Sequence, residues 1–318
     1  MPATLEAALH PANLDKAWRA MSSDRAPWQP GIAREEMEGQ RLRHQLSLIE
    51  SVRQGRYRPE PMRQFAVPKA NGGERVLSAL YLRDKFLQRA VAQVLEPVGE
   101  QHFHADSYAY RPRRNVAMAL QRCGERIRCG FPWLVDADIR SFFDEIPHRP
   151  LLSAFDGLVR DRGLRSIVRQ WLENFASTRS LFGGNRGIPQ GAVVSPFLCN
   201  LYLDALDRAW AGQRIPFVRY ADDFLLFTPT EAEARRAFAF TAKHLDRLGL
   251  ALHPEKSRVV RAGRDVAFLG QPLPAPPGPR GLSSDAHAHG RRQLAQVSDL
   301  QAVAFVKRVR PFPRLKGD

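Results

Sequence analysis

Apolar and polar positions along the chain follow several distinct patterns, and each pattern predicts an element. Residues 1–57 carry apolar positions at helical spacing, interrupted by a segment with two prolines at 24–31, after which the helical spacing resumes at 35–52. Residues 58–80 predict a β-hairpin, because two apolar runs flank Asn71-Gly72-Gly73, which is a strong turn signal. Further helices are predicted at 84–95, at 151–175, from Ser195-Pro196 to 206, and at 231–248.

Two runs rich in β-forming residues meet at a pair of carboxylates in Phe217-Val218-Arg219-Tyr220-Ala221-Asp222-Asp223-Phe224-Leu225-Leu226-Phe227. The pattern predicts a β-hairpin with Asp222 and Asp223 at or beside its turn. Carboxylates between buried strands are costly unless a cation lies against them. Mg²⁺ takes carboxylate oxygens and substrate phosphates together, so the pair suggests phosphoryl transfer. A hairpin whose acids simply face water is the alternative.

A second acidic stretch lies upstream, in Trp133-Leu134-Val135-Asp136-Ala137-Asp138-Ile139-Arg140-Ser141-Phe142-Phe143-Asp144, where an apolar strand is predicted to run from Trp133 to Phe143. Between the two stretches lies Gly187-Ile188-Pro189-Gln190-Gly191-Ala192-Val193-Val194-Ser195-Pro196. Together these motifs resemble those of reverse transcriptases in order and spacing. The resemblance is strongest to the bacterial group II intron-like branch, which includes stand-alone and CRISPR-associated enzymes, and it covers roughly residues 40–270.

The resemblance implies an α+β fold, with the palm and fingers of a right-hand polymerase. Residues 1–57 would form a helical N-terminal extension and residues 58–132 the fingers. Residues 133–270 would form the palm with part of the fingers. Residues 271–318 would form a proline-rich spacer and a basic, very short thumb-like tail, in which apolar positions predict one helix at 295–306.

Metal binding and catalysis are also implied by the resemblance. The implied metal ligands are Asp138, the carbonyl of Ile139, Asp222 and Asp223. They would hold two Mg²⁺ ions, with Mn²⁺ as a substitute. Spacing alone leaves Asp136 and Asp144 as competing acids for the place of Asp138. The implied catalytic residues are Asp138, Asp222, Asp223 and Lys256, the last matching a position that protonates the leaving pyrophosphate.

The resemblance also implies a set of substrate-binding residues. They are Lys69, Arg75, Arg111, Phe143, Gln190 and Gly191. Lys69 and Arg75 would close over the incoming triphosphate, and a solvated basic turn is the alternative. Phe143 would clash with a ribonucleotide 2′-OH and so select deoxynucleotides, unless it is only a core aromatic. Arg111 would contact template or triphosphate, or else form a structural ion pair.

Composition supports a nucleic-acid partner. The chain has 318 residues, with 48 Lys and Arg against 33 Asp and Glu, for a net charge of +15. A polyanionic partner is the first expectation from such a charge. The three cysteines show no Cys-x-x-Cys spacing, and no apolar run approaches the length of a membrane span. We therefore expect a cytoplasmic protein without a membrane role.

The predicted function is RNA-directed DNA synthesis from a primer 3′-OH. The expected partners are an RNA template, a DNA or RNA primer, deoxynucleoside triphosphates, and a further protein or non-coding RNA. The predicted setting is CRISPR-associated or another defence system. The alternatives are a truncated group II intron-type reverse transcriptase and a catalytically idle RNA-binding scaffold.

Overall fold

A computed structural model describes residues 3–68, 74–179 and 185–277. The chain divides into two compact units. Unit 1 combines Met1–Gln101 with Phe143–Leu201, and unit 2 combines His102–Phe142 with Tyr202–Asp318. Lys69 and the basic tail from residue 278, with the helix expected at 295–306, lie outside the described residues.

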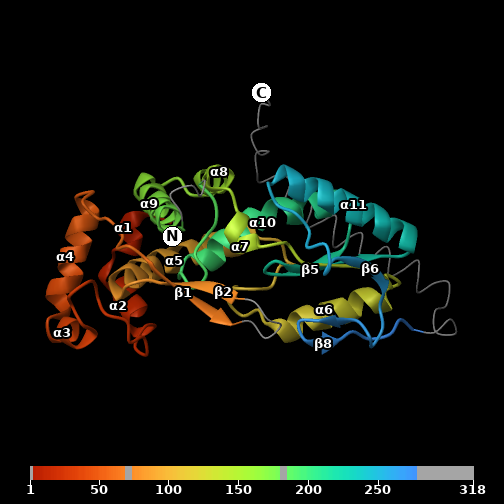
Figure 1. The fold of residues 1–318 in the computed structure, drawn as a ribbon, viewed down its shortest axis with the longest axis horizontal. Coiled ribbons are helices and arrows are strands. Elements are labelled where there is room, and N and C mark those ends of the chain that lie inside the picture. The colour runs from red at the N-terminus through yellow and green to blue at the C-terminus, as the bar shows by residue number, and fades with distance from the viewer. Residues whose placement is uncertain (1–2, 69–73, 180–184, 278–318) are drawn as a thin grey trace, which may run out of the picture. The chain divides into compact units, whose positions relative to one another are not determined.

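Unit 1 is mainly helical, with one hairpin (Figure 1). Its elements are α1 Leu5–Ala8, α2 Pro11–Arg19, α3 Arg34–Gly39, α4 Arg41–Arg53, β1 Arg63–Pro68, β2 Glu74–Ala79, α5 Leu82–His102 up to Gln101, α7 Phe142–Glu145 from Phe143, α8 His148–Leu158, α9 Arg162–Arg179 and the start of α10 Ser195–Gly212. The β1–β2 pair is antiparallel, as the turn signal predicts.

The core of unit 1 joins the N-terminal helices to α5. The buried Trp28 ring lies 6.1 Å from the ring of Phe86, and the amide of Leu82 donates to the carbonyl of Pro27. A buried polar link adds to this packing. The Tyr57 hydroxyl donates to the Asp84 carboxylate (2.7 Å) and accepts a hydrogen bond from the Trp171 indole (2.9 Å). The N-terminal extension, α5 and α9 therefore share one hydrogen-bonded core.

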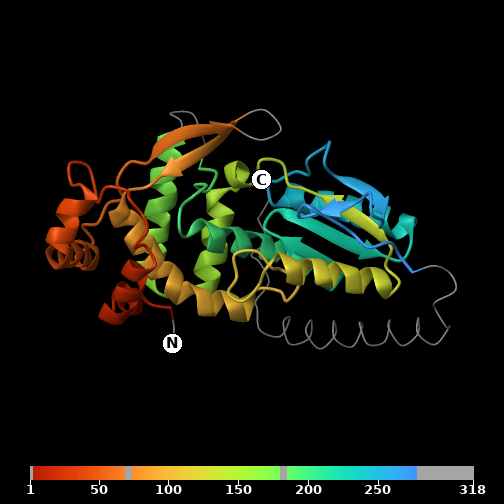
Figure 2. The same cartoon turned by 90° about the horizontal axis from the view of Figure 1, so that it is seen from below.

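Unit 2 is built around an antiparallel sheet in the order β4-β5-β3-β6. Its elements are the end of α5, α6 Val116–Arg128, β3 Trp133–Ala137, the rest of α10 from Tyr202, β4 Phe217–Tyr220, β5 Asp223–Thr228, α11 Glu231–Arg247, β6 Arg258–Arg261, β7 Ala267–Phe268 and β8 Gln271–Pro272. Helix α11 packs on one face of the sheet and α6 on the other (Figures 1 and 2). Both faces are therefore covered.

This two-sided cover explains the apolar runs beside the acids. Leu225 and Phe227 pack with Ile127 of α6, whereas the Phe224 ring lies 4.7 Å from the ring of Trp210. A strand that alternates between two buried faces carries apolar residues at every position. Phe224 to Phe227 is such a run, and each of its side chains is fully buried.

Four predicted elements differ from the structure. The helix predicted at 84–95 is longer and spans Leu82–His102. The helix predicted at 151–175 is two helices, because Val159 is extended and the Asp161 carboxylate accepts the amide hydrogen of Leu164, which starts a new helix. The helix that resumes at 35 breaks at Gln40, just after the poor helix former Gly39. The strand predicted from Trp133 to Phe143 ends at Ala137.

Candidate active site

The turn between β4 and β5 presents two of the predicted acids. Asp222 lies in the turn and Asp223 is the first residue of β5. The residue before them, Ala221, has a positive φ of 59°, a conformation that residues other than glycine rarely adopt. The strands on both sides, which are buried except for Tyr220 and Asp223 next to the turn, hold this tight turn in place.

Asp138 reaches the same end of the sheet from the neighbouring strand. It directly follows Ala137, which is paired with Phe224 at the start of β5. Its backbone carbonyl accepts the amide hydrogen of His253 (2.8 Å), and its carboxylate lies 3.0 Å from the ammonium group of Lys256. The central position of β3, between β5 and β6, therefore brings an acid and a lysine to the hairpin turn.

The charged groups at this end of the sheet shift one another's pKa values. Desolvation, then the repulsion of Asp222 and Asp138, raises the pKa of Asp223 to about 6. Desolvation likewise raises the pKa of Asp222, and the charge of Asp138 adds to it. A hydrogen bond to Asp138 raises the pKa of Lys256, which therefore keeps its proton at neutral pH. Neighbouring acids with raised pKa values are typical of functional sites.

The competing acid Asp136 lies in a different environment. Its carboxylate accepts a hydrogen bond from Arg258 of β6 at 3.0 Å. Asp138 acts on the pKa values of both hairpin acids, whereas Asp136 contributes only the smallest of the effects on Asp223. The structure therefore favours Asp138 over Asp136 as the third acid of the cluster.

The acids suit a hard divalent cation. Within the described ranges, no three His, Cys, Asp or Glu side chains are grouped closely enough to hold an ion alone. Mg²⁺ in phosphoryl-transfer sites is held by one or two carboxylates together with substrate phosphates, rather than by an all-protein cage. Three aspartates that repel one another supply the negative charge that such ions require. The predicted carbonyl ligand, Ile139, is buried in a bridge with Leu252.

The predicted nucleotide-contacting residues belong mostly to unit 1. Phe143 is the second residue of α7, and its carbonyl accepts the amide hydrogen of Ile188 (2.7 Å). This bond ties Phe143 to the loop that carries Gln190 and Gly191. Gly191 has a φ of 97°, which glycine adopts readily. Arg75 lies in β2. The roles of these residues remain predictions.

Arg111 belongs to unit 2 and is buried. Its guanidinium donates to the carbonyls of His104 (2.6 Å) and Ser107 (2.9 Å) and lies 5.8 Å from the centre of the Phe103 ring. These contacts, to backbone carbonyls and an aromatic ring, hold Arg111 within unit 2. Its contact with template or triphosphate, and the structural ion pair that is the alternative, stay predictions.

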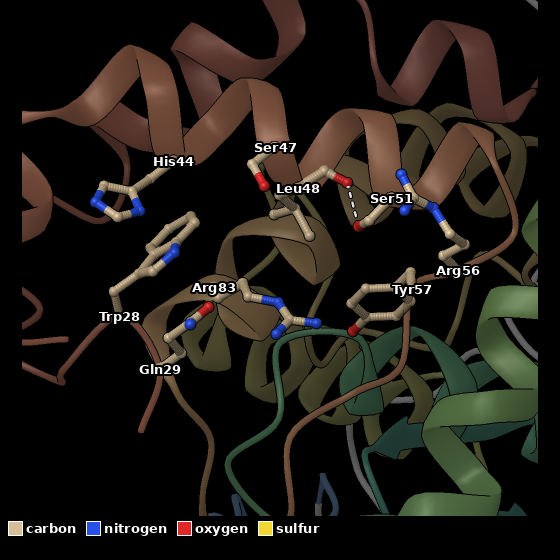
Figure 3. A pocket seen from close by; sticks show the side chains of 9 residues that line it. All are labelled: Trp28, Gln29, His44, Ser47, Leu48, Ser51, Arg56, Tyr57 and Arg83. Carbon is tan, nitrogen blue, oxygen red and sulfur yellow. Dashed lines mark hydrogen bonds between the residues drawn. The ribbon is translucent and has the colours of Figure 1, made fainter. Parts of the chain in front are cut away.

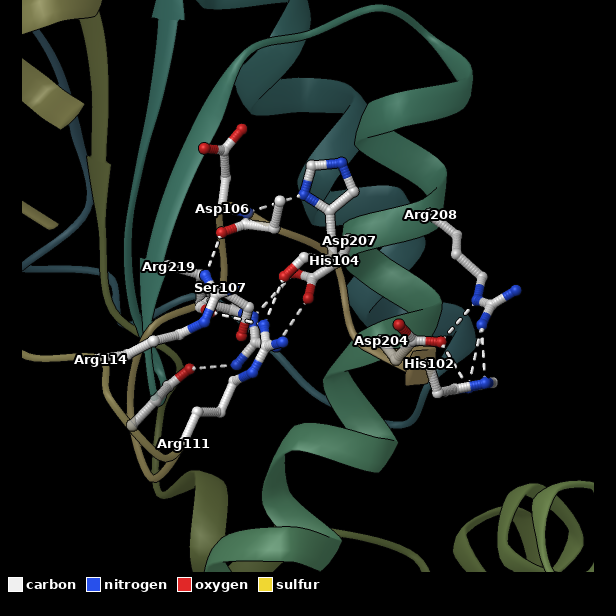
Figure 4. Close-up of polar contacts among 12 residues, drawn as sticks. His102, His104, Asp106, Ser107, Arg111, Arg114, Asp204, Asp207, Arg208 and Arg219 are labelled. Carbon is white, nitrogen blue, oxygen red and sulfur yellow. Dashed lines mark hydrogen bonds and ion pairs between the residues drawn. The ribbon is translucent and has the colours of Figure 1, made fainter. Parts of the chain in front are cut away.

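The sequence motifs missed a buried ion pair behind the turn. Arg219 of β4 and Asp207 of α10 are both fully buried and form two hydrogen bonds, of 2.7 and 2.6 Å (Figure 4). The signal was present, because an arginine in the middle of an apolar strand is rarely buried without a partner. No local pattern, however, names Asp207 as that partner.

A separate hollow of about 200 Å³ lies in unit 1, between α4 and the start of α5 (Figure 3). It is lined by Trp28, Gln29, His44, Ser47, Leu48, Ser51, Arg56, Tyr57 and Arg83. Several of its polar groups already have protein partners. Ser51 donates to the carbonyl of Leu48, and Arg83 pairs with Glu60. The hollow adds no nucleophile to the acid cluster.

In the described part of the chain, no helix combines the length and apolar character needed to cross a membrane.

Comparison with known proteins matches the same region of the chain. The family model described as "Reverse transcriptase (RNA-dependent DNA polymerase)" matches residues 67–273, which include all three acids and Lys256. This match covers more than half of the chain.

Individual relatives agree with this match. Protein YkfC of Escherichia coli is 29% identical over 311 residues, covering 83% of this chain and 80% of that protein. The group II intron-encoded protein LtrA of Lactococcus lactis is 28% identical over 205 residues, covering 64% of this chain but 34% of that protein. Among solved structures, a partial Cas6-RT-Cas1–Cas2 complex aligns with a TM-score of 0.42 and 23% identity, over 76% of this chain and 41% of that chain.

Proposed function

We propose a function from the premise that the chain belongs to the reverse transcriptase family, in its bacterial group II intron-like branch, and is an RNA-directed DNA polymerase. The proposed reaction adds a deoxynucleotide to the 3′-OH of a primer paired with an RNA template. The observation that carries it is the gathering of Asp138, Asp222 and Asp223 at one end of the unit 2 sheet, beside Lys256.

The residues of the acid cluster would have different roles in the proposed reaction. Asp138 and Asp222 would together hold the two divalent ions, and Asp223 would lie beside them. When bound, two Mg²⁺ ions, or Mn²⁺ in their place, lower the pKa of the primer 3′-OH and neutralise charge on the triphosphate. Lys256 stays protonated because its pKa is raised, so it has a proton to give to the leaving pyrophosphate.

Residues outside the cluster would orient the substrate. Phe143 would lie against the sugar C2′ and exclude ribonucleotides. Gln190 and Gly191 would lie beside the template base and incoming nucleotide, where the positive φ of the glycine permits a close backbone approach. Lys69, Arg75 and Arg111 would contact phosphates of the triphosphate or template. The predicted domains, with fingers at 58–132 and palm at 133–270, belong to this proposal.

The test is primer extension by purified protein on RNA and DNA templates, with each nucleotide withheld in turn. Extension should require a divalent ion and follow the template. Asp222→Asn should abolish it, because the change removes a negative charge from the metal site while keeping the side-chain shape. Asp136→Asn is the matched control, since Asp136 is a competing acid in the same unit that pairs with Arg258 instead of Lys256. Primer extension by Asp222→Asn at the wild-type rate would show that Asp222 is not a metal ligand.

The proposed setting is a CRISPR-associated or other defence system, acting with a protein or non-coding RNA partner. A group II intron origin is the alternative. Sequencing the RNA that co-purifies with the chain separates them, because an intron enzyme retains its own intron transcript. Recovery of a single intron RNA would overturn the defence setting.

A further inference from the structure

The turn that carries Asp222 depends on a side chain from the strand before it. Arg219 of β4 is fully buried, and its Nη1 donates to the carbonyl oxygen of Ala221 at 3.0 Å. Ala221 holds the positive φ of 59°. Its carbonyl belongs to the peptide plane that leads directly into Asp222. The hydrogen bond therefore sets the orientation of the backbone that aims the Asp222 carboxylate.

Asp207 of α10 in turn fixes Arg219 (Figure 4). The Asp207 carboxylate accepts hydrogen bonds from Nε and Nη2 of Arg219, at 2.7 and 2.6 Å. This two-point contact fixes the plane of the guanidinium and leaves Nη1 directed at Ala221. Both side chains are fully buried, so water is not at hand to replace either partner.

The backbone of Arg219 is held as firmly as its side chain. Its amide donates to the carbonyl of Asp106, and its carbonyl accepts the amide hydrogen of Tyr108, both at 2.9 Å. Asp106 is itself paired with Arg122 and Arg126 of α6. The position of Arg219 is therefore fixed from α6 and from α10 at once.

We propose that Asp207 is a positioning residue for the metal site, acting through Arg219 and the Ala221 carbonyl on the Asp222 carboxylate. The inference rests on the proposed function, because it concerns the affinity of the acid cluster for divalent ions. Groups that orient a metal ligand from behind typically change metal affinity by on the order of 10- to 100-fold when removed.

A second acid on α10 provides a matched control. Asp204 lies one turn earlier, is also buried, and pairs with Arg208 and His102. Among the described residues, its contacts are with Arg208 and His102 and do not reach the hairpin turn. Asp204→Asn therefore disrupts a buried ion pair on the same helix without touching the chain of bonds to Asp222.

The experiment measures Mn²⁺ binding by electron paramagnetic resonance in the full chain, alongside the unfolding midpoint and the Mg²⁺ dependence of nucleotide addition. Asp207→Asn and Arg219→Lys should each raise the Mn²⁺ dissociation constant by about tenfold or more. Asp204→Asn should leave the Mn²⁺ dissociation constant within about twofold of the wild-type value, even if this change lowers the unfolding midpoint as much as Asp207→Asn does. An unchanged constant in Asp207→Asn, or an equal rise in Asp204→Asn, overturns the inference.

Loss of a buried partner can prevent folding, so a second variant keeps the test decisive. The double change Asp207→Leu with Arg219→Met replaces the ion pair by apolar side chains, which is often tolerated in a core. This variant should fold and still bind Mn²⁺ weakly, because the Ala221 carbonyl has lost its donor. Tight Mn²⁺ binding by it overturns the positioning role. Absence of Mn²⁺ binding in the wild-type protein overturns the proposed function instead.

Discussion

Replacement of Lys256 tests whether this lysine is a proton donor or only a counter-charge. Its ammonium group lies 3.0 Å from the carboxylate of Asp138, and its side chain is 54% exposed. Two unit charges at this distance attract by about 1.4 kcal/mol in a medium like water. Exposed ion pairs measured in proteins contribute about 0–1 kcal/mol net. Removal of the charge alone should therefore change metal affinity or rate by no more than about fivefold.

Loss of a general acid has a much larger effect. Proton transfer by a positioned side chain typically contributes ~10²–10⁴-fold to the rate. We expect Lys256→Met to lower the rate of single-nucleotide addition by at least about a hundredfold at saturating Mg²⁺. Lys256→Arg should show the wild-type Mg²⁺ dependence, because arginine keeps the positive charge. Its rate should stay as low as that of Lys256→Met, because the guanidinium holds its proton too tightly to donate it.

The chain contains a matched control for this change. Arg258 pairs with Asp136 at the same distance of 3.0 Å, with side chains that are 55% and 19% exposed, against 54% and 18% for Lys256 and Asp138. Arg258→Met should stay within about fivefold of the wild-type rate. The assay is rapid-quench addition of one nucleotide across a range of Mg²⁺ concentrations and pH. Equal, small losses in Lys256→Met and Arg258→Met would refute the role of Lys256 as a proton donor.

Three further predictions concern the substrate, the metal and the fold. Phe143→Ala should narrow the preference for deoxynucleotides, measured as the ratio of kcat/KM for the two sugars; an unchanged ratio makes Phe143 a core residue. The raised pKa of Asp223, about 6, means that protons compete with metal below that pH, so Mg²⁺ affinity should fall by about tenfold per pH unit there. A pH-independent affinity between pH 5 and 7 would contradict this. Tyr57→Phe removes one buried hydrogen-bond partner from the Asp84 carboxylate and one from the Trp171 indole. The free energy of unfolding measured in urea should therefore fall by about 1–3 kcal/mol, and an unchanged unfolding midpoint would contradict the buried link.

The sequence located the hairpin and its acids because the signal is local. Apolar runs on both sides of Asp222 and Asp223, broken only by Arg219 and Tyr220 in β4, arise because these strands are buried on both faces, and such burial favours apolar residues at nearly every position. Ser195-Pro196 at the start of α10 is equally local, because proline fits the first turn of a helix.

Other features depend on contacts between distant parts of the chain. Strand β6 is short and partly exposed, so its pattern gave no clear signal, although its pairing with β3 places Lys256 beside Asp138. The break at Val159 was missed because apolar spacing continues across it. The N-cap residue Asp161 was the sign that a second helix begins there.

The two cations near the acids differ in a way that fits a metal-dependent reaction. Arg219 is fully buried and bound on several sides, so its charge stays behind the turn whatever binds in front. Lys256 is more than half exposed, and its ion pair with Asp138 is weak enough for a divalent ion to displace. In the proposed site, Asp138 would hold a divalent ion, and Lys256 would then be able to turn from Asp138 toward the leaving pyrophosphate with its proton. Arg219 would keep its hydrogen bond to the Ala221 carbonyl, so the turn would stay in place.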